Sequence, residues 1–83
     1  MKAQISDFTE SEFLAYVRKI YSVDFPSDKD HIKAVMEFAR LTEHPGKADL
    51  IYYPEEGKDG PEAVVAEIKA WRAANGRPGF KAE

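Results

Sequence analysis

The sequence predicts an all-α domain, because three segments repeat apolar residues at the helical period and one short apolar segment has no partner strand. The chain has 83 residues, of which 43% are hydrophobic and 12% aromatic. That composition is too apolar for intrinsic disorder and is enough for one small core. There is no cysteine, so packing must hold the fold without disulfides or a thiolate-bound metal. We expect a single domain over residues 1–83.

The first helix is predicted to begin after Thr9. Thr9 and Glu12 have the spacing of a capping box, in which a hydroxyl and a carboxylate exchange hydrogen bonds with each other's backbone. Phe8 and Phe13, on either side of this cap, are placed to pack as a hydrophobic staple. Apolar residues then follow one helical face to about residue 22.

The second and the last helix are bounded by capping and breaking residues. Ser27, with Asp30 three positions later, opens a helix that is predicted to run to about Glu43. Gly60–Glu62, which includes Pro61, opens the last helix, and Asn75 with Gly76 closes it. The core stripe of this last helix is predicted to be Val64, Val65, Ile68 and Trp71.

The segment between these helices, residues 49–54, is ambiguous by pattern. Its β-branched and aromatic residues favour a strand, whereas Asp49 as an N-cap and Pro54 as a stop fit one helical turn. Because a lone strand would have nothing to pair with, a helical turn is the preferred interpretation.

The net charge of −3 is unevenly distributed. Residues 24–62 carry ten acidic and five basic side chains. Direct nucleic-acid binding needs clustered Lys and Arg, so this acidic section argues against it and suits a basic protein partner. The apolar runs are too short for a membrane span, and the first residues do not resemble a signal peptide, so we expect a cytoplasmic protein without membrane contact.

The helix over residues 27–43 is more apolar than a bundle core requires, because its apolar residues spread over roughly 220° of the helical wheel. Ala34, Phe38 and Leu41 share the side expected to face the bundle. The opposite shoulder is either wrapped by the rest of this small domain or forms a partner surface with an acidic edge. Its residues are Asp28, His31, Ile32, Val35, Met36 and Ala39.

Tyr52 and Tyr53 favour the partner surface. Neighbouring side chains on a helical turn point about 100° apart, so both rings cannot enter the core of such a short element. Tyrosine is a preferred anchor at protein interfaces, and each ring could bury ~150–250 Å² in a complex. The alternative is a tyrosine at the edge of the core whose hydroxyl is satisfied there.

The chain has few side chains that are suited to catalysis or metal binding. His31 and His44 are the only histidines, there is no cysteine, and the serines lie mostly at caps or in loops. We therefore expect no enzyme activity, no metal site and no cofactor. His44, just before Pro45, is interpreted as a helix C-terminal residue placed favourably against the helix dipole.

Three stretches resemble the immunity proteins of nuclease colicins and S-type pyocins. They are ISDFTESEFL near the start, LTEHPGKADLIYYP in the middle and IKAWRAANGRPGFK near the end. The resemblance implies a distorted antiparallel four-helix bundle with a very short third helix. It also implies a tight inhibitor that protects the producing bacterium from its own toxin.

In that family the inhibitor binds a basic nuclease domain, usually a metal-dependent DNase, at an exosite beside the active site. The resemblance implies a monomer when free and a 1:1 heterodimer with the toxin, with which it can leave the cell. Shared binding positions fall on Asp49, Tyr52, Tyr53 and Pro54, and discriminating positions fall on the shoulder residues given above. His31 and Ala39 depart from colicin members, where an aliphatic residue and an acid are usual.

Two other classes of function stay open on the residues alone. The same shoulder and tyrosines could form a helical homodimer or an adaptor module, which sedimentation of the isolated chain would reveal. A small enzyme or a DNA-mimicking regulator is disfavoured by the small catalytic inventory and the modest acidity.

Overall fold

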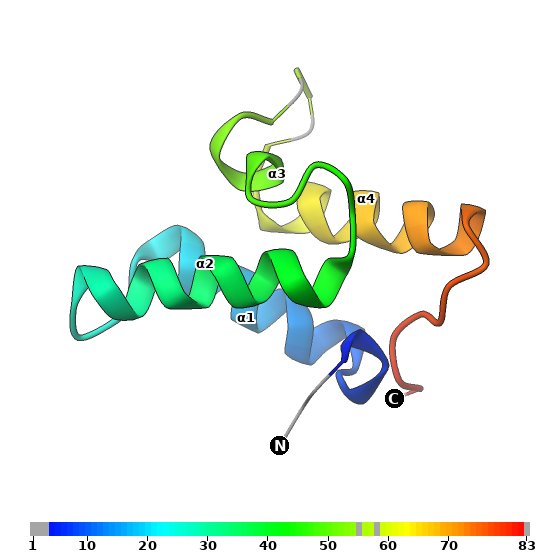
Figure 1. Cartoon of the computed structure of the whole chain (residues 1–83), viewed down its shortest axis with the longest axis horizontal. Helices are drawn as coiled ribbons and strands as arrows, with labels where there is room; N and C mark the ends of the chain where they lie inside the picture. Colours follow the sequence, from blue (N-terminus) through cyan, green and yellow to red (C-terminus); the bar gives the residue numbers. More distant parts are fainter. Residues whose placement is uncertain (1–3, 55, 58, 83) are drawn as a thin grey trace.

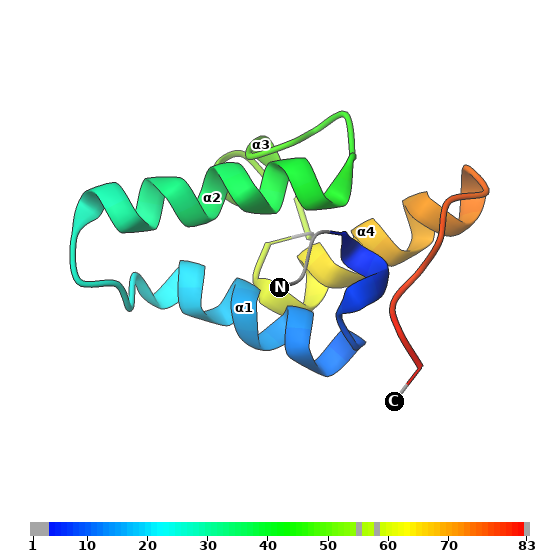
Figure 2. The same cartoon turned by 60° about the horizontal axis from the view of Figure 1, so that its bottom comes forward.

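The computed structural model describes residues 4–54, 56–57 and 59–82. The bounds of its elements are η1 Ile5–Asp7, α1 Glu10–Ser22, α2 Asp28–Thr42, α3 Asp49–Tyr52 and α4 Pro61–Ala74, where η1 is a 3-10 helix. Helices α1 and α2 run antiparallel, and α3 is a single turn between α2 and α4 (Figures 1 and 2). The prediction of a four-helix bundle with a very short third helix is confirmed.

The predicted caps of the first two long helices are present. The Thr9 hydroxyl accepts from the Glu12 amide at 3.1 Å, and the Glu12 carboxylate accepts from the Thr9 amide at 2.9 Å. The Ser27 hydroxyl accepts from the Asp30 amide at 3.2 Å. Each of these side chains satisfies an amide that has no partner within its own helix, which explains where the two helices begin.

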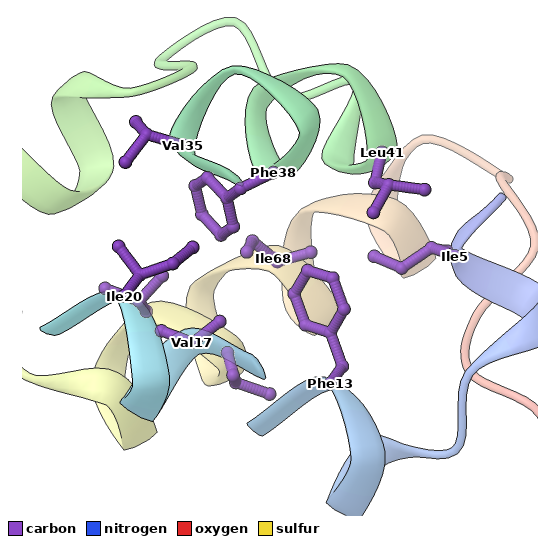
Figure 3. Close-up of a cluster of buried hydrophobic side chains, with 10 residues drawn as sticks. Ile5, Phe13, Val17, Ile20, Val35, Phe38, Leu41 and Ile68 are labelled. Carbon is purple, nitrogen blue, oxygen red and sulfur yellow. The ribbon is translucent and has the colours of Figure 1, made fainter. Parts of the chain in front are cut away.

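The core lies between α1, α2 and α4, with η1 closing one end (Figure 3). Phe13 of α1 is at its centre, and its ring lies 5.4 Å from Phe8 and 6.0 Å from Phe38 between centroids. The Phe8 contact confirms the staple expected beside the first cap. The buried hydrophobic residues are Ile5, Phe13, Val17, Ile20, Val35, Phe38, Leu41, Val64, Val65 and Ile68.

Helices α1 and α2 are also joined by a polar contact. The Tyr16 hydroxyl donates to the backbone carbonyl of Ala34 at 2.7 Å. Burial, reinforced by the nearby carboxylate of Glu37, raises the pKa of Tyr16 to about 12. The phenol therefore stays protonated and keeps donating to α2 at any pH at which the protein would normally work.

The core stripe of α4 differs from the prediction at its C-terminal end. Val64, Val65 and Ile68 are buried as expected, whereas Trp71 is only partly buried and Arg72 is 4% exposed. Periodicity could not show this, because Arg72 is buried by its polar contacts and by the chain that follows α4 rather than by an apolar face.

The C-terminal tail, which was not predicted to have regular contacts, packs back on the start of the bundle. The Lys81 amide donates to the carbonyl of Phe8 at 2.7 Å, and the Phe80 ring lies 5.5 Å from that of Phe13. In Figure 1 the tail descends from the end of α4 toward the N-terminal end of α1. Phe80 is one of the partly buried side chains that pack against the core, so the tail contributes to its cover.

The ambiguous segment forms a helical turn, as preferred, but it begins one residue earlier than predicted. Ala48 is the N-cap and Asp49 is the first helical residue. Asp49 is therefore not the N-cap, although as an acid in the first turn it still interacts favourably with the turn's amides.

Candidate protein-binding surface

Helix α3 is held as a tight turn by backbone hydrogen bonds that begin before it. The Asp49 amide donates to Gly46 at 2.9 Å, and the Tyr53 amide donates to Asp49 at 2.8 Å. Leu50 and Ile51 are partly buried and pack against the core. Because these two side chains occupy the inward face, the residues that follow are turned toward solvent.

Both tyrosines of this segment are exposed. The exposed fraction is 51% for Tyr52 and 79% for Tyr53. No hydrogen bond of either phenol is seen within the described part of the chain. Asp49 is also exposed, and Pro54 is partly buried at the end of the turn. The structure therefore brings together the four residues that were predicted on this element.

The shoulder of α2 is exposed only in part. Ile32 and Met36 are 55% and 68% exposed, and within the described ranges they are two of five large hydrophobic residues that face solvent. Asp28 is exposed at the start of the helix, and Ala39 is partly buried. An exposed isoleucine and methionine four residues apart lie on one helical face and offer apolar area to a partner.

Val35 does not belong to this exposed shoulder, and its predicted exposure is wrong. It is 3% exposed and contributes to the core beside Phe38 (Figure 3). Residues three apart share a helical face, so Val35 follows Phe38 inward once α1 packs closely on this side. It can affect a partner only by fixing the position of α2.

His31 is partly buried and makes contacts within the chain. Its Nε2 donates to the carbonyl of Ile20 at 3.0 Å, and its ring lies edge-on to Phe25 with centroids 5.6 Å apart. These contacts join the first turn of α2 to the last turn of α1. His31 therefore positions the exposed residues around it in addition to lining the surface.

Charge on this face of α2 is partly balanced locally. Glu37 and Arg40 form an ion pair, and the guanidinium hydrogen bond holds the pKa of Glu37 below its usual value. Asp28 and Asp49, in contrast, have no ion-pair partner among the described residues. The unbalanced acids thus lie beside the exposed apolar side chains, as an interface with a basic partner requires.

A hollow of about 200 Å³ lies behind α3 and opens beside Tyr53. Its walls are formed by residues of the α2–α3 loop, α3 and the first half of α4. One wall carries His44, whose Nδ1 accepts from the Gly46 amide at 2.8 Å and whose Nε2 lies 3.2 Å from the Glu67 carboxylate. The ring also packs on Trp71, with centroids 5.1 Å apart.

The expectation that His44 faces the dipole of α2 is therefore not met. The helix ends at Thr42, and His44 is turned toward α4, where it fixes the loop that leads to α3. A nitrogen that accepts from an amide carries no proton, so Nε2 donates to Glu67. His44 supports the shape of the surface through this contact.

The sequence did not predict that Val23, in the loop between α1 and α2, would be an exposed hydrophobic residue. It is 54% exposed and follows directly after α1. No periodic pattern could have indicated it, because it lies in the loop between two helices.

Within the residues that the structure describes, no group of three His, Asp or Glu side chains is arranged to hold a metal ion. Over the same residues, no helix is both long and apolar enough to cross a membrane. The surface formed by α2 and α3 presents exposed tyrosines, Ile32 and Met36 beside exposed acidic side chains.

Comparison with known proteins places this chain in a family context. The family model for colicin immunity protein and pyocin immunity protein matches residues 5–74. The pyocin-S2 and pyocin-S1 immunity proteins of Pseudomonas aeruginosa are each 54% identical over 86 residues, with 99% of both chains covered.

Solved structures agree with this match. A chain in the crystal structure of the pyocin AP41 DNase-immunity complex has a TM-score of 0.90 and 41% identity, with 99% of this chain and 100% of that chain covered. A chain in the structure of a mutant nuclease domain of pyocin S8 with its cognate immunity protein has a TM-score of 0.88 and 43% identity, with 98% and 100% covered. The chain belongs to the colicin and pyocin immunity protein family.

Proposed function

We propose that this chain binds and inhibits the nuclease domain of a cognate pyocin- or colicin-type toxin, and so protects the cell that makes the toxin. Family membership supports this function, as do solved relatives described as DNase-immunity complexes. The observation that carries it is the exposure of both Tyr52 and Tyr53 on a turn packed firmly against the core. Rigid, exposed aromatic rings are the usual anchors of a tight interface.

Helices α2 and α3 have different roles in this binding. Asp49, Tyr52, Tyr53 and Pro54 on and after α3 supply affinity for related nucleases. The exposed residues of α2 supply discrimination, because a mismatched shape or an unpaired charge beneath that helix penalises the wrong toxin. The discriminating residues are Asp28, His31, Ile32, Met36 and Ala39.

The inhibitor acts beside the nuclease active site and contributes no chemistry of its own. Its acidic face is attracted to a basic nuclease, and once bound it keeps duplex DNA away by bulk and by like charge. The complex contains one copy of each chain, and the free inhibitor is a monomer. It acts in the cytoplasm of the producing cell and can leave the cell bound to the toxin.

Titration against a panel of pyocin and colicin nuclease domains, including ribonuclease types, tests this function. We expect one domain to lose duplex-DNA cleavage at a 1:1 ratio, and cells that express the chain to survive the corresponding toxin. Cleavage by every domain in the presence of excess chain, with no survival, would contradict the function. Sedimentation that gives a dimer for the isolated chain would instead favour self-association through this surface.

Binding beside the active site has its own test. A small phosphodiester substrate should still be hydrolysed in the inhibited complex, because the active site stays open to a molecule that does not reach the inhibitor. Loss of both activities would show that the inhibitor occupies the active site.

A further inference from the structure

Val23 has an unusual backbone conformation. It caps the C-terminus of α1 with φ 54° and ψ 41°, in the left-handed region. Its amide donates to Ile20 at 3.2 Å, and the next amide, of Asp24, donates to Lys19 at 3.2 Å. Helices commonly end in this way, but the residue in this conformation is normally glycine or asparagine. A side chain branched at Cβ is among the least suited to it.

The other non-glycine residues with positive φ differ from Val23. Glu43 is held by its carboxylate, which pairs with Arg72 and Arg77 at 3.1 Å each. Lys47 carries a flexible polar side chain into solvent. Val23 differs from both, because its side chain is apolar and cannot form an ion pair. That side chain is 54% exposed, so burial does not offset the strain.

The position of Val23 indicates which interaction offsets the conformational strain at this residue. Because His31 donates to the carbonyl of Ile20, the first turns of α2 are fixed against the last turn of α1. Val23 follows Ile20 by three residues and precedes Asp28, the first residue of α2, by five, so it lies in the loop that joins the two helices. This loop is at the left in Figure 2. The exposed valine therefore adds apolar surface to the loop that directly precedes α2.

We propose that Val23 is a specificity-determining contact residue whose exposed side chain packs against an apolar patch on the cognate nuclease domain. This inference rests on the proposed function and adds the α1–α2 loop to the surface. Strained conformations persist where the surrounding structure enforces them and where they serve a functional site. Here the strain directs a compact, rigid apolar group outward, and burying such a group mainly slows dissociation.

Two substitutions separate a contact role from a structural one. V23N introduces a polar side chain of similar size that adopts the left-handed conformation with little strain. V23I keeps the apolar, branched character and the strain. The two variants and the wild type are compared by thermal unfolding, and by association and dissociation rates with the cognate nuclease domain.

V23N should unfold at a temperature equal to or a few degrees above that of the wild type, because the strain is relieved. It should dissociate from the nuclease about tenfold faster, with an association rate within about twofold. V23I should dissociate within about threefold of the wild-type rate. Greater stability combined with weaker binding is a result that a structural residue would not give.

Three results would overturn the inference in distinguishable ways. A V23N chain that binds like the wild type would remove Val23 from the interface and leave the proposed function intact. A V23N chain that is less stable would show that the valine serves the fold. A wild-type chain that inhibits no nuclease would remove the proposed function, and with it this role for Val23.

Discussion

The Nε2 of His31 donates to the carbonyl oxygen of Ile20 at 3.0 Å, and this contact fixes the start of α2 against the end of α1. The imidazole therefore has a positioning role at the end of the hairpin. Its contact with Phe25 holds the connecting loop to the same site.

Replacing His31 by leucine should lower the free energy of unfolding by about 1 kcal/mol, because one hydrogen bond is lost while the apolar volume is kept. Urea unfolding of both chains measures the difference. The matched control is Ile32→Ala at the neighbouring exposed position, which should change stability by less than about 0.5 kcal/mol. A leucine variant as stable as the wild type would show that the hydrogen bond contributes nothing.

Tyr52→Ala and Tyr53→Ala should each weaken binding to the cognate nuclease by at least about 2 kcal/mol. The exposed rings lose their buried area in the complex, whereas the fold loses little, so thermal unfolding should be nearly unchanged. Isothermal calorimetry gives the affinities. Phenylalanine at either position keeps the ring and serves as the control for the hydroxyl. Losses below about 0.5 kcal/mol for both alanine variants would exclude the tyrosines as anchors.

Features set by short sequence intervals could be predicted. The Thr9 and Glu12 pair, the Ser27 cap and the position of Pro61 each determine a helix start from residues within one turn. The exposure of Tyr52 and Tyr53 followed from too little chain to cover two adjacent rings. In each case the physical cause lies within about five residues.

Burial that depends on distant chain could not be predicted. Val35 lies near the middle of the apolar arc of α2, between the side that faces the core and the exposed shoulder, so its exposure is decided by how closely α1 approaches. Arg72 is buried because the tail and the end of α2 supply carbonyl partners, and Val23 is exposed because the loop turns it outward. Such outcomes depend on the relative placement of the helices and the tail, which the period of apolar residues in the sequence does not predict.

The association rate with the cognate nuclease should fall steeply as salt is added. Asp28 and Asp49 are exposed and lie in the acidic section of the chain, so they steer the inhibitor toward a basic partner over distances that salt screens. Stopped-flow measurements at several ionic strengths test this, and the dissociation rate should change far less. An association rate that is independent of salt would exclude steering.

Tyr16→Phe should destabilise the fold by about 1 kcal/mol at neutral pH, because the hydroxyl no longer donates to Ala34. The pKa of Tyr16 is raised from 10.0 when unfolded to about 12 when folded. Its contribution is therefore complete below pH 10 and declines as the pH rises toward 12.

The pH dependence of this difference is read from denaturant unfolding of the wild type and of Tyr16→Phe between pH 8 and about 12. The stability gap between them should narrow across the upper part of that range. Every other titrating group is shared by the two chains and cancels in the comparison. A gap that stays constant to the highest pH would show that the Tyr16 phenol is not held protonated by the fold.

Arg72→Met should lower the free energy of unfolding by roughly 2–3 kcal/mol, which is more than His31→Leu or Tyr16→Phe. The buried guanidinium donates to the carbonyls of Pro78 at 2.6 Å and Thr42 at 3.0 Å, and it pairs with Glu43 at 3.1 Å. Methionine fills similar volume but leaves the Thr42 carbonyl without this donor and releases the tail. Arg72→Lys restores the charge without the forked geometry and should recover only part of the loss. Chemical unfolding followed by Trp71 fluorescence measures both variants, and a methionine variant as stable as the wild type would show that the tail is held by apolar packing alone.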